Sequence, residues 1–297
     1  MEARSEFSST GVAAPRRVAL PPHVYFLVSA VFHYLGPAFA VLLFAAIAPL
    51  GVAWLRIASA GLVFAIWRRP WRYFRTADRR TRYRIFMLGG VLALMNACFY
   101  LAIARLPLGT VGAIEFLGPI GLAALGMRTG RNLSALGLAA LGVYVLTDVR
   151  LPGEPLGFAF AFANMALFAL YVVLGHRIAG DGGREGIDRL GAAMLVALVA
   201  ALPLGIGDAV PAFTHPLLLA AAFGVGISSS VIPYVCDQLA MARLPRATFA
   251  LLLSLLPATA SVIGILVLRQ IPSNAELLGI ALVVAGVALH REASARP

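Results

Sequence analysis

Lysine is absent from this sequence, cysteine occurs only twice, and charged residues are scarce. Only 12% of the 297 residues are charged, against about 25% in soluble domains, while 61% are hydrophobic. A soluble fold of that composition would expose large apolar patches, so a water-soluble globular protein is excluded. Cys98 and Cys236 have no CxxC spacing and are too few for a disulfide framework. The composition therefore predicts an integral membrane protein embedded in a lipid bilayer.

Motifs of enzymes and of cofactor sites are missing as well. HExxH, GxSxG, Walker and strand-linked GxGxxG patterns do not occur in a suitable context. We therefore expect no catalytic residues, no metal ligands and no cofactor. No ATP-hydrolysis motif occurs either.

Positive charge is what the sequence has in excess. The net charge is +11, and every basic residue is an arginine. Basic proteins often bind nucleic acid. Here, however, the arginines cluster in short segments between apolar runs, the pattern that membrane insertion and anionic lipids recognise. We therefore expect no nucleic-acid partner.

Ten apolar runs are candidates for membrane-crossing helices, several of them near the lower length limit of about 17–20 residues. They are continuous rather than alternating, which favours helices over barrel strands. The predicted spans are 24–47, 49–67, 85–104, 110–127, 133–147, 156–175, 190–207, 216–237, 248–268 and 275–290. The predicted fold class is an all-α membrane protein with ten transmembrane helices.

The distribution of arginine predicts the orientation. Eight arginines lie between residues 68 and 84, and a block of that size is hard to translocate. With this block inside, twenty arginines fall on the cytoplasmic side and three outside, and both chain ends are cytoplasmic. Residues 1–22 are expected to form a disordered cytoplasmic tail, and residues 292–297 a second tail.

Two segments of the chain resemble each other. Residues 98–119 align without a gap with residues 236–257, and ten of the 22 positions are identical where chance would give about two. The chain therefore divides into two halves, 23–150 and 151–291, each with five predicted spans. Because five is odd, the halves must insert with opposite orientations. Inverted repeats of this kind surround a central site that opens alternately to either side.

Several stretches of the chain resemble one known family. They are HYLGPAFAVLLF from His33, GVAWLRIASAGLVFAIWRRPWR from Gly51, NACFYLAIARLPLGTVGAIEFLGP from Asn96, SSVIPY from Ser229 and LLGIALVVAGVALHR from Leu277. They are similar to the EamA branch of the drug/metabolite transporter superfamily, and within it to threonine/homoserine-type exporters. The resemblance implies ten helices, inverted five-helix repeats and export of small metabolites, amino acids foremost, across a bacterial inner membrane.

Two positions depart from that pattern. Where such exporters carry SLEP, this chain has apolar Leu256 in place of the carboxylate, and a Gly-Glu pair is replaced by Arg269 and Gln270. Substrate or proton residues of the second half therefore do not transfer directly. Other branches carry drugs or other metabolites, and a non-transporting scaffold or a membrane-embedded enzyme is the alternative from another class. The oligomeric state is left open between monomer and homodimer.

Glu115 is the sharpest candidate for a functional residue, because an ionisable group in hydrocarbon needs a reason to be there. It precedes Pro119 by four residues, and Gly118 with Pro119 can loosen the helix and free a backbone carbonyl. Its carboxylate is predicted to bind a substrate ammonium group or to take up a proton as substrate leaves. Arg56 either pairs with Glu115, binds a substrate carboxylate, or reaches the interface with its head group. A carboxyl that only packs helices is the alternative for Glu115.

Two polar pairs are expected to line the same cavity. Asn96 and Tyr100 lie one helical turn apart and share a face. Tyr234 and Gln238 repeat that spacing at the equivalent positions of the second half. Inversion would turn both pairs toward a common axis. Hydrogen bonding between helices is the alternative for both.

The first and sixth spans are counterparts under inversion, so Tyr34, Asn164 and Tyr171 are expected to border the pathway. His33 and Asp237 are candidates for proton coupling, with a locally satisfied histidine and an interfacial carboxylate as alternatives.

Pro119 and Pro257 occupy equivalent positions of the two repeats. They are expected to act as hinges or to form static kinks.

Overall fold

The computed structural model describes residues 21–126, 129–150, 154–179, 184–241 and 256–289. Regular structure in these ranges is helical throughout. The first half contains α1 (Pro22–Leu43), α2 (Pro49–Arg68), α3 (Trp71–Thr76), α4 (Arg79–Ile103), α5 (Leu108–Gly126) and α6 (Gly130–Arg150). The second half contains α7 (Pro155–Ala179), α8 (Arg184–Thr214), α9 (Pro216–Gly226), the π-helix η1 (Ile227–Val231), α10 (Ile232–Met241), α12 (Leu256–Leu268) and α13 (Asn274–Leu289).

Six helical stretches of the described chain are long and apolar enough to cross a membrane. They are His23–Leu43, Pro49–Arg68, Arg79–Ile103, Pro155–Gly175, Glu185–Thr214 and Pro216–Asp237. Four shorter apolar helices accompany them, namely Leu108–Leu122, Gly130–Leu146, Leu256–Leu268 and Asn274–Leu289. The prediction of an all-helical membrane protein is confirmed. The residues before 256 in the predicted span 248–268 lie outside the described residues.

Several predicted boundaries were wrong, because hydropathy does not mark where a helix ends. The first predicted span continued to residue 47, whereas α1 ends at Leu43 and a turn leads to Pro49. The third was predicted from residue 85, whereas α4 begins at Arg79 because Asp78 caps it with its carboxylate. The seventh was predicted as 190–207, but α8 runs from Arg184 to Thr214. Helices α4 and α8 therefore continue beyond their apolar runs, whereas α1 is shorter than its apolar run.

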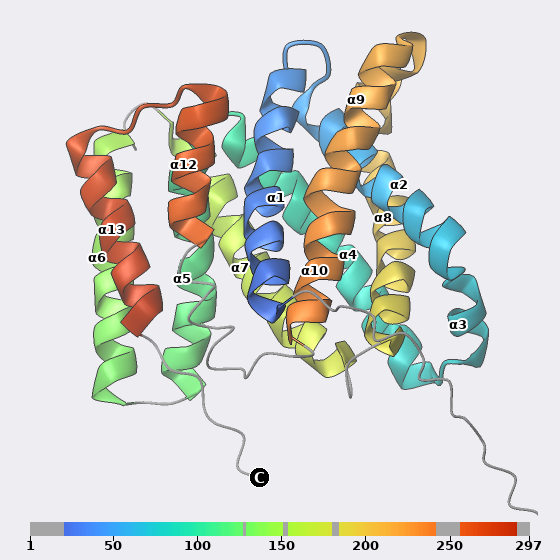
Figure 1. Cartoon of the computed structure of the whole chain (residues 1–297), viewed down its shortest axis with the longest axis horizontal. Coiled ribbons are helices and arrows are strands. Elements are labelled where there is room, and N and C mark those ends of the chain that lie inside the picture. Colours follow the sequence, from blue (N-terminus) through green and yellow to red (C-terminus); the bar gives the residue numbers. More distant parts are fainter. Residues whose placement is uncertain (1–20, 127–128, 151–153, 180–183, 242–255, 290–297) are drawn as a thin grey trace, which may run out of the picture.

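The helices stand side by side and alternate in direction along the chain (Figure 1). The start of α1 and the end of α13 lie at the same end of the bundle, and α3 lies toward that end as well (Figure 1). Helix α6 packs against α13 and α2 against α8; α4 contacts α7 and α8, while α1 contacts α10 and α12. Helix α5 contacts α6, α7 and α12. The halves are therefore interleaved rather than separate.

Small residues allow the closest approach between helices of opposite halves. A Cβ atom built on Gly142 of α6 would lie 2.5 Å from the carbonyl oxygen of Gly279 on α13. A Cβ atom on Gly286 would lie 2.7 Å from the carbonyl oxygen of Ala135. Backbones this close leave no room for a side chain, as is typical of helix pairs in membranes.

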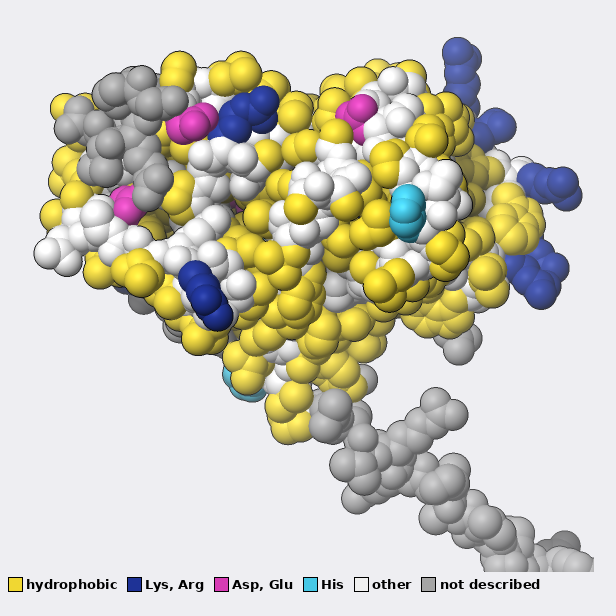
Figure 2. All heavy atoms as spheres, turned by 90° about the horizontal axis from the view of Figure 1, so that it is seen from above, with side chains coloured by type: hydrophobic (Ala, Val, Ile, Leu, Met, Phe, Trp, Pro, Cys, Tyr) yellow, Lys and Arg dark blue, Asp and Glu magenta, His cyan; other side chains and the backbone are white. Residues whose placement is uncertain are grey.

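Apolar side chains cover much of the outer surface. Ile66, Val199 and Leu217 are among the large hydrophobic residues that remain exposed. Figure 2 shows apolar side chains over most of the visible face, with arginines projecting at the edge on the side of α3. Lipid tails solvate such a surface, so its exposure is expected for a protein of this class.

Candidate functional site

Three prolines interrupt the regular hydrogen bonding of three helices. Pro37 lies inside α1, Pro119 inside α5, and Pro233 near the start of α10. Proline has no N–H, so the carbonyl four residues earlier cannot accept the usual helical hydrogen bond. The carbonyls affected belong to His33, Glu115 and Ser229. These residues mark where polar groups gather inside the bundle.

Arg56 of α2 is buried and is held by three groups. Its Nε donates to the Ser230 hydroxyl at 2.9 Å, and Nη2 donates to the carbonyl oxygen of Ser229 at 2.9 Å. Nη1 donates to the Asn96 side chain. The guanidinium carbon also lies 5.6 Å from the ring centroid of Tyr100. The predicted site residues Asn96 and Tyr100 thus lie beside Arg56, whereas the predicted alternative of an ion pair between Arg56 and Glu115 is not found among the described residues.

The sequence explains why Ser229 accepts a hydrogen bond from another helix. Pro233 cannot donate to the Ser229 carbonyl, which is therefore left for Arg56. The helix also widens here into the π-helix η1, in which the amide of Ile232 donates to the carbonyl of Ile227. Short π-helical turns often occur at functional sites. Ser229 and Ser230 were not predicted as partners of Arg56, although the run SSSVIP from Ser228 was the available signal.

Two glycines bring neighbouring helices against η1. A Cβ atom on Gly36 of α1 would lie 2.3 Å from the Ser229 Cβ, and one on Gly226 of α9 would lie 2.4 Å from the Ser59 Cβ. Ser59 lies on α2, three residues beyond Arg56. Without these contacts the backbone of η1 could not come within reach of the Arg56 guanidinium.

Glu115 lies on α5 in the first half, and its hydrogen-bond partner lies on α7 in the second half. Its Oε1 accepts a hydrogen bond of 3.1 Å from Nδ2 of Asn164 on α7, and both residues are buried. Tyr34 of α1 and Arg56 face the same carboxyl group at longer range. A Cβ atom built on Gly112, one turn before Glu115 on α5, would lie 3.1 Å from the Tyr34 hydroxyl oxygen. Helices α1, α5 and α7 therefore bring three predicted site residues together.

Four buried polar atoms in this region have no hydrogen-bond partner in the part of the chain that the structure describes. They are the hydroxyls of Tyr34 and Tyr100, Oε2 of Glu115 and Oδ1 of Asn164. Buried polar groups are nearly always satisfied in proteins, because an unpaired one costs about 1–3 kcal/mol. The four atoms come from α1, α4, α5 and α7. A polar solute or water could satisfy several of them together.

Aromatic rings form one wall beside these polar groups. Phe116 contacts Phe168, which stacks on Tyr171 with ring centroids 5.9 Å apart. The ring of Tyr171 lies 6.4 Å from that of Tyr234 on α10. This row links α5, α7 and α10. The predicted site residues Tyr171 on α7 and Tyr234 on α10 therefore lie in contact. Helix α7 packs against α5, and α10 packs against α1.

The remaining predicted residues lie at the margin of this region or outside the described residues. The ring of His33 contacts that of Tyr34, at 5.2 Å between centroids. Asp237 lies near Ser29 of α1, whose hydroxyl donates to the carbonyl oxygen of Pro233 at 3.3 Å. The side chain of Gln238 lies outside the described residues. Pro119 lies within continuous α5, and Pro257 is the second residue of α12 as described.

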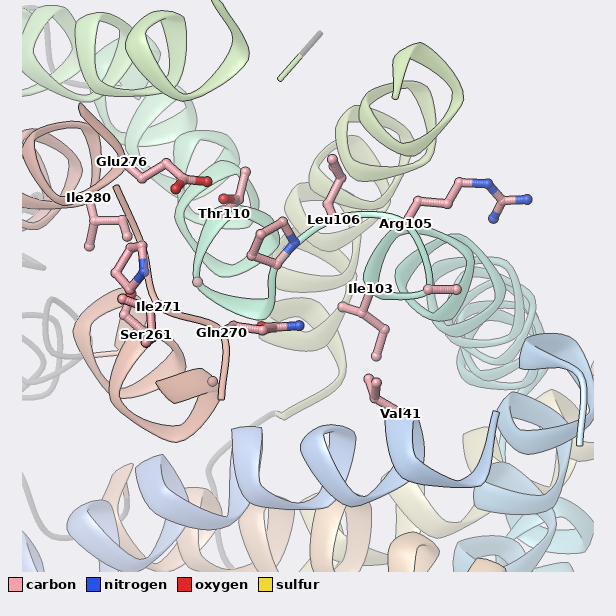
Figure 3. A pocket seen from close by; sticks show the side chains of 15 residues that line it. Val41, Ile103, Arg105, Leu106, Thr110, Ser261, Gln270, Ile271, Glu276 and Ile280 are labelled. Carbon is pink, nitrogen blue, oxygen red and sulfur yellow. The ribbon is translucent and has the colours of Figure 1, made fainter. Parts of the chain in front are cut away.

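A cavity of about 310 Å³ lies at the end of the bundle opposite the start of α1. Its lining includes Arg105 from the α4–α5 turn, Thr110 from α5, Gln270 from the α12–α13 connection and Glu276 from α13 (Figure 3). None of the predicted site residues with a described side chain lines it. Gln270 joins the halves here, because its Oε1 accepts a hydrogen bond of 3.0 Å from the amide of Leu108.

Comparison with known proteins agrees with this architecture. Residues 155–291 match the EamA-like transporter family. The chain is 31% identical over 253 residues to the threonine/homoserine exporter RhtA of Escherichia coli K12, and 30% identical over 256 residues to that of Salmonella typhimurium LT2. Both alignments cover 84% of this chain and 84% of the relative. A solved crystal structure superimposes with a TM-score of 0.55 at 18% identity, covering 90% of this chain and 96% of the other, which shows a shared fold. The chain belongs to the EamA-like transporter family.

Proposed function

We propose that this protein is a secondary transporter that exports small zwitterionic metabolites, amino acids such as threonine or homoserine foremost, by alternating access. The names of the 30–31% identical relatives support the substrate class. The bacterial inner membrane is the proposed location, with both chain ends in the cytoplasm. The end of the bundle that holds the start of α1 and the end of α13 would then face the cytoplasm (Figure 1).

The observation that carries this proposal is the set of unpartnered polar atoms inside the bundle. Glu115 Oε2 and Asn164 Oδ1 are acceptors that fit an ammonium group. Arg56 uses three of its five N–H donors in the hydrogen bonds described, so two remain for a carboxylate. An α-amino acid carries both groups. The hydroxyls of Tyr34 and Tyr100 would add hydrogen-bond donors between the groups that bind the ammonium and those that bind the carboxylate.

The packing of the helices supports the inverted repeat that alternating access requires. Under inversion, α1, α2, α4, α5 and α6 correspond to α7, α8, the α9–η1–α10 unit, α12 and α13. The contact of α4 with α7 then has its counterpart in α10 with α1, and that of α5 with α7 in α12 with α1. The pairs α2–α8, α5–α12 and α6–α13 are their own counterparts. Such a pattern is expected for two similar halves around one axis.

Coupling to protons is the second part of the proposal. Glu115 is the residue best placed to exchange a proton for the substrate, because its carboxyl group connects α5 of the first half to Asn164 on α7 of the second half. Asp237 and His33 would pass protons toward one end of the bundle. Pro119 and Pro257 would absorb the changes in backbone angle as the halves move.

Flux of threonine or homoserine in proteoliposomes, with and without a pH gradient, tests this proposal. Native protein is expected to carry the solute faster when the gradient is present. Glu115→Gln removes the charge at constant shape, so flux should fall and its dependence on the gradient should disappear. Glu154→Gln, which changes an exposed carboxylate at the start of α7, serves as the matched control. A Glu115→Gln variant with native flux and native pH response would show that proton coupling through Glu115 is wrong.

A further inference from the structure

The connection between α2 and α4 forms a distinct surface, which we call the arginine corner and define as residues 66–87. The backbone leaves α2 through Arg69, whose φ of 49° is in the left-handed region. It then forms the short helix α3 and enters α4 after Asp78. The corner joins two helices that are long and apolar enough to cross a membrane, so it lies where a membrane surface would be.

The arginine corner is held in place by helix α8. Nε of Arg68 donates to Oδ1 of Asp188 at 2.7 Å. Nε of Arg189 donates to the hydroxyl of Tyr73 at 2.7 Å, and the same arginine pairs with Glu185. These contacts fix α3 against the bundle. Its exposed side chains therefore belong to a defined surface.

Six arginines of the corner are exposed and form no ion pair among the described residues. They are Arg69, Arg72, Arg75, Arg79, Arg80 and Arg82. Asp78 is the one carboxylate between residues 66 and 87. It accepts hydrogen bonds from the amides of Arg80 and Thr81, and its interaction with Thr81 holds the pKa of its carboxyl below the usual value. Asp78 thus caps α4 and leaves the six guanidinium groups uncompensated.

Large apolar side chains are exposed beside these arginines. Ile66 is 72% exposed and Tyr83 is 65% exposed, and Trp67, Trp71 and Phe86 are exposed as well. Tryptophan and tyrosine are the residues that settle at the headgroup level of a bilayer. Figure 2 shows arginines projecting next to apolar side chains at this edge of the molecule. Positive and apolar groups are therefore available to one ligand at the same time.

We propose that the arginine corner is a binding site for an anionic phospholipid. The guanidinium groups of Arg72, Arg75 and Arg79 bind the headgroup phosphate, for which arginine offers paired donors. Ile66 and Phe86 lie against the acyl chains. A nucleic acid or an acidic peptide would match the charge alone, and would leave the exposed apolar side chains in contact with water.

Native mass spectrometry of the detergent-purified protein tests this site with dioleoylphosphatidylglycerol and dioleoylphosphatidylcholine as probes. The native protein is expected to retain phosphatidylglycerol more tightly than phosphatidylcholine. In the triple variant Arg72→Gln, Arg75→Gln, Arg79→Gln the preference should fall by about fivefold for each arginine removed. The triple Lys variant keeps the charges, so it should retain most of the preference.

Arg269→Gln removes an exposed arginine at the opposite end of the bundle and should leave phosphatidylglycerol binding unchanged. The proposal is overturned if the triple Gln variant, folded as judged by its thermal unfolding, binds phosphatidylglycerol as tightly as the native protein. Equal retention of both lipids by the native protein also overturns it. That comparison needs no variant, so it decides the question even if the Gln variant does not fold.

Discussion

Arg56 shows how much one side chain can organise inside a membrane. A charged group in hydrocarbon is costly, and it persists where other groups satisfy its donors. Here Asn96, Ser229 and Ser230 do so from two different helices. The guanidinium therefore links α2, α4 and η1, and its planar shape is what allows three acceptors to be reached at once.

Arg56→Lys is expected to destabilise the protein although the charge is kept. A lysine ammonium group cannot reach all three acceptors in the same geometry. Each lost hydrogen bond to a charged group costs about 1.5–3 kcal/mol. Thermal unfolding in detergent should show a lower midpoint, and flux in proteoliposomes should fall. Arg105→Lys, which changes a half-buried arginine bonded to a single carbonyl oxygen, should alter both much less. Equal effects of the two changes would contradict the role assigned to Arg56.

Helix η1 is an irregular helical turn that supplies a backbone acceptor to another helix, because the Ser229 carbonyl oxygen accepts from Arg56. Pro233 and the π-helical turn leave backbone groups of α9 and α10 without their regular partners. Glycines at positions 36 and 226 let α1 and α2 approach that backbone closely. The irregular turn is therefore tolerated because other helices supply the missing contacts, as expected for irregular backbone at membrane depth.

Gly226→Ala tests this packing. Its added methyl group would lie 2.4 Å from the Ser59 Cβ, so α2 and α9 must separate, at a cost of about 1–3 kcal/mol. Gly224→Ala is the matched control on the same helix, because its Cβ would meet no atom within 4 Å. The control should be neutral or slightly stabilising, since alanine favours helix over glycine. Thermal midpoints in detergent should therefore separate the two variants, and similar midpoints would argue against close packing at η1.

At the scale of the whole molecule, α6 and α13, which are the last helices of the two halves, pack against each other. Its close approach depends on Gly142 and Gly279. In a bilayer, helices associate through such packing, because lipid tails are as apolar as the side chains they would replace. This pair lies at the far side of the bundle from α3 (Figure 1). It therefore stabilises the association of the halves without touching the proposed substrate site.

Gly142→Ala is expected to weaken the association of the halves, because the new Cβ would lie 2.5 Å from the Gly279 carbonyl oxygen. The cost should be about 1–3 kcal/mol, seen as a lower thermal midpoint in detergent. Gly137→Ala on the same helix meets no atom within 4 Å and should leave the midpoint unchanged or slightly raised. The affinity of the folded Gly142→Ala protein for its solute should be close to native. A large loss of affinity with an unchanged midpoint would show that α6 and α13 act on the site instead.

The amino-acid sequence by itself determined the class of this protein. Hydropathy and charge add up along a continuous stretch of chain, so the apolar helices, the block of arginines and the family resemblance could all be predicted without a structure. The crossing of the membrane by ten helices and the inversion of the halves stay predictions. Glu115 could be singled out for a similar reason, since a carboxylate in an apolar run is conspicuous in any context.

Only the tertiary structure decided which polar groups meet. Arg56 and Glu115 were natural partners by charge, yet Arg56 binds Asn96 and η1 while Glu115 accepts from Asn164. Arg56 and Ser230 are 174 residues apart, and their contact depends on how closely two glycine-bearing helices pack. Hydrogen bonds act over a few ångströms, so a partner is set by the positions of helix backbones, which local sequence does not specify.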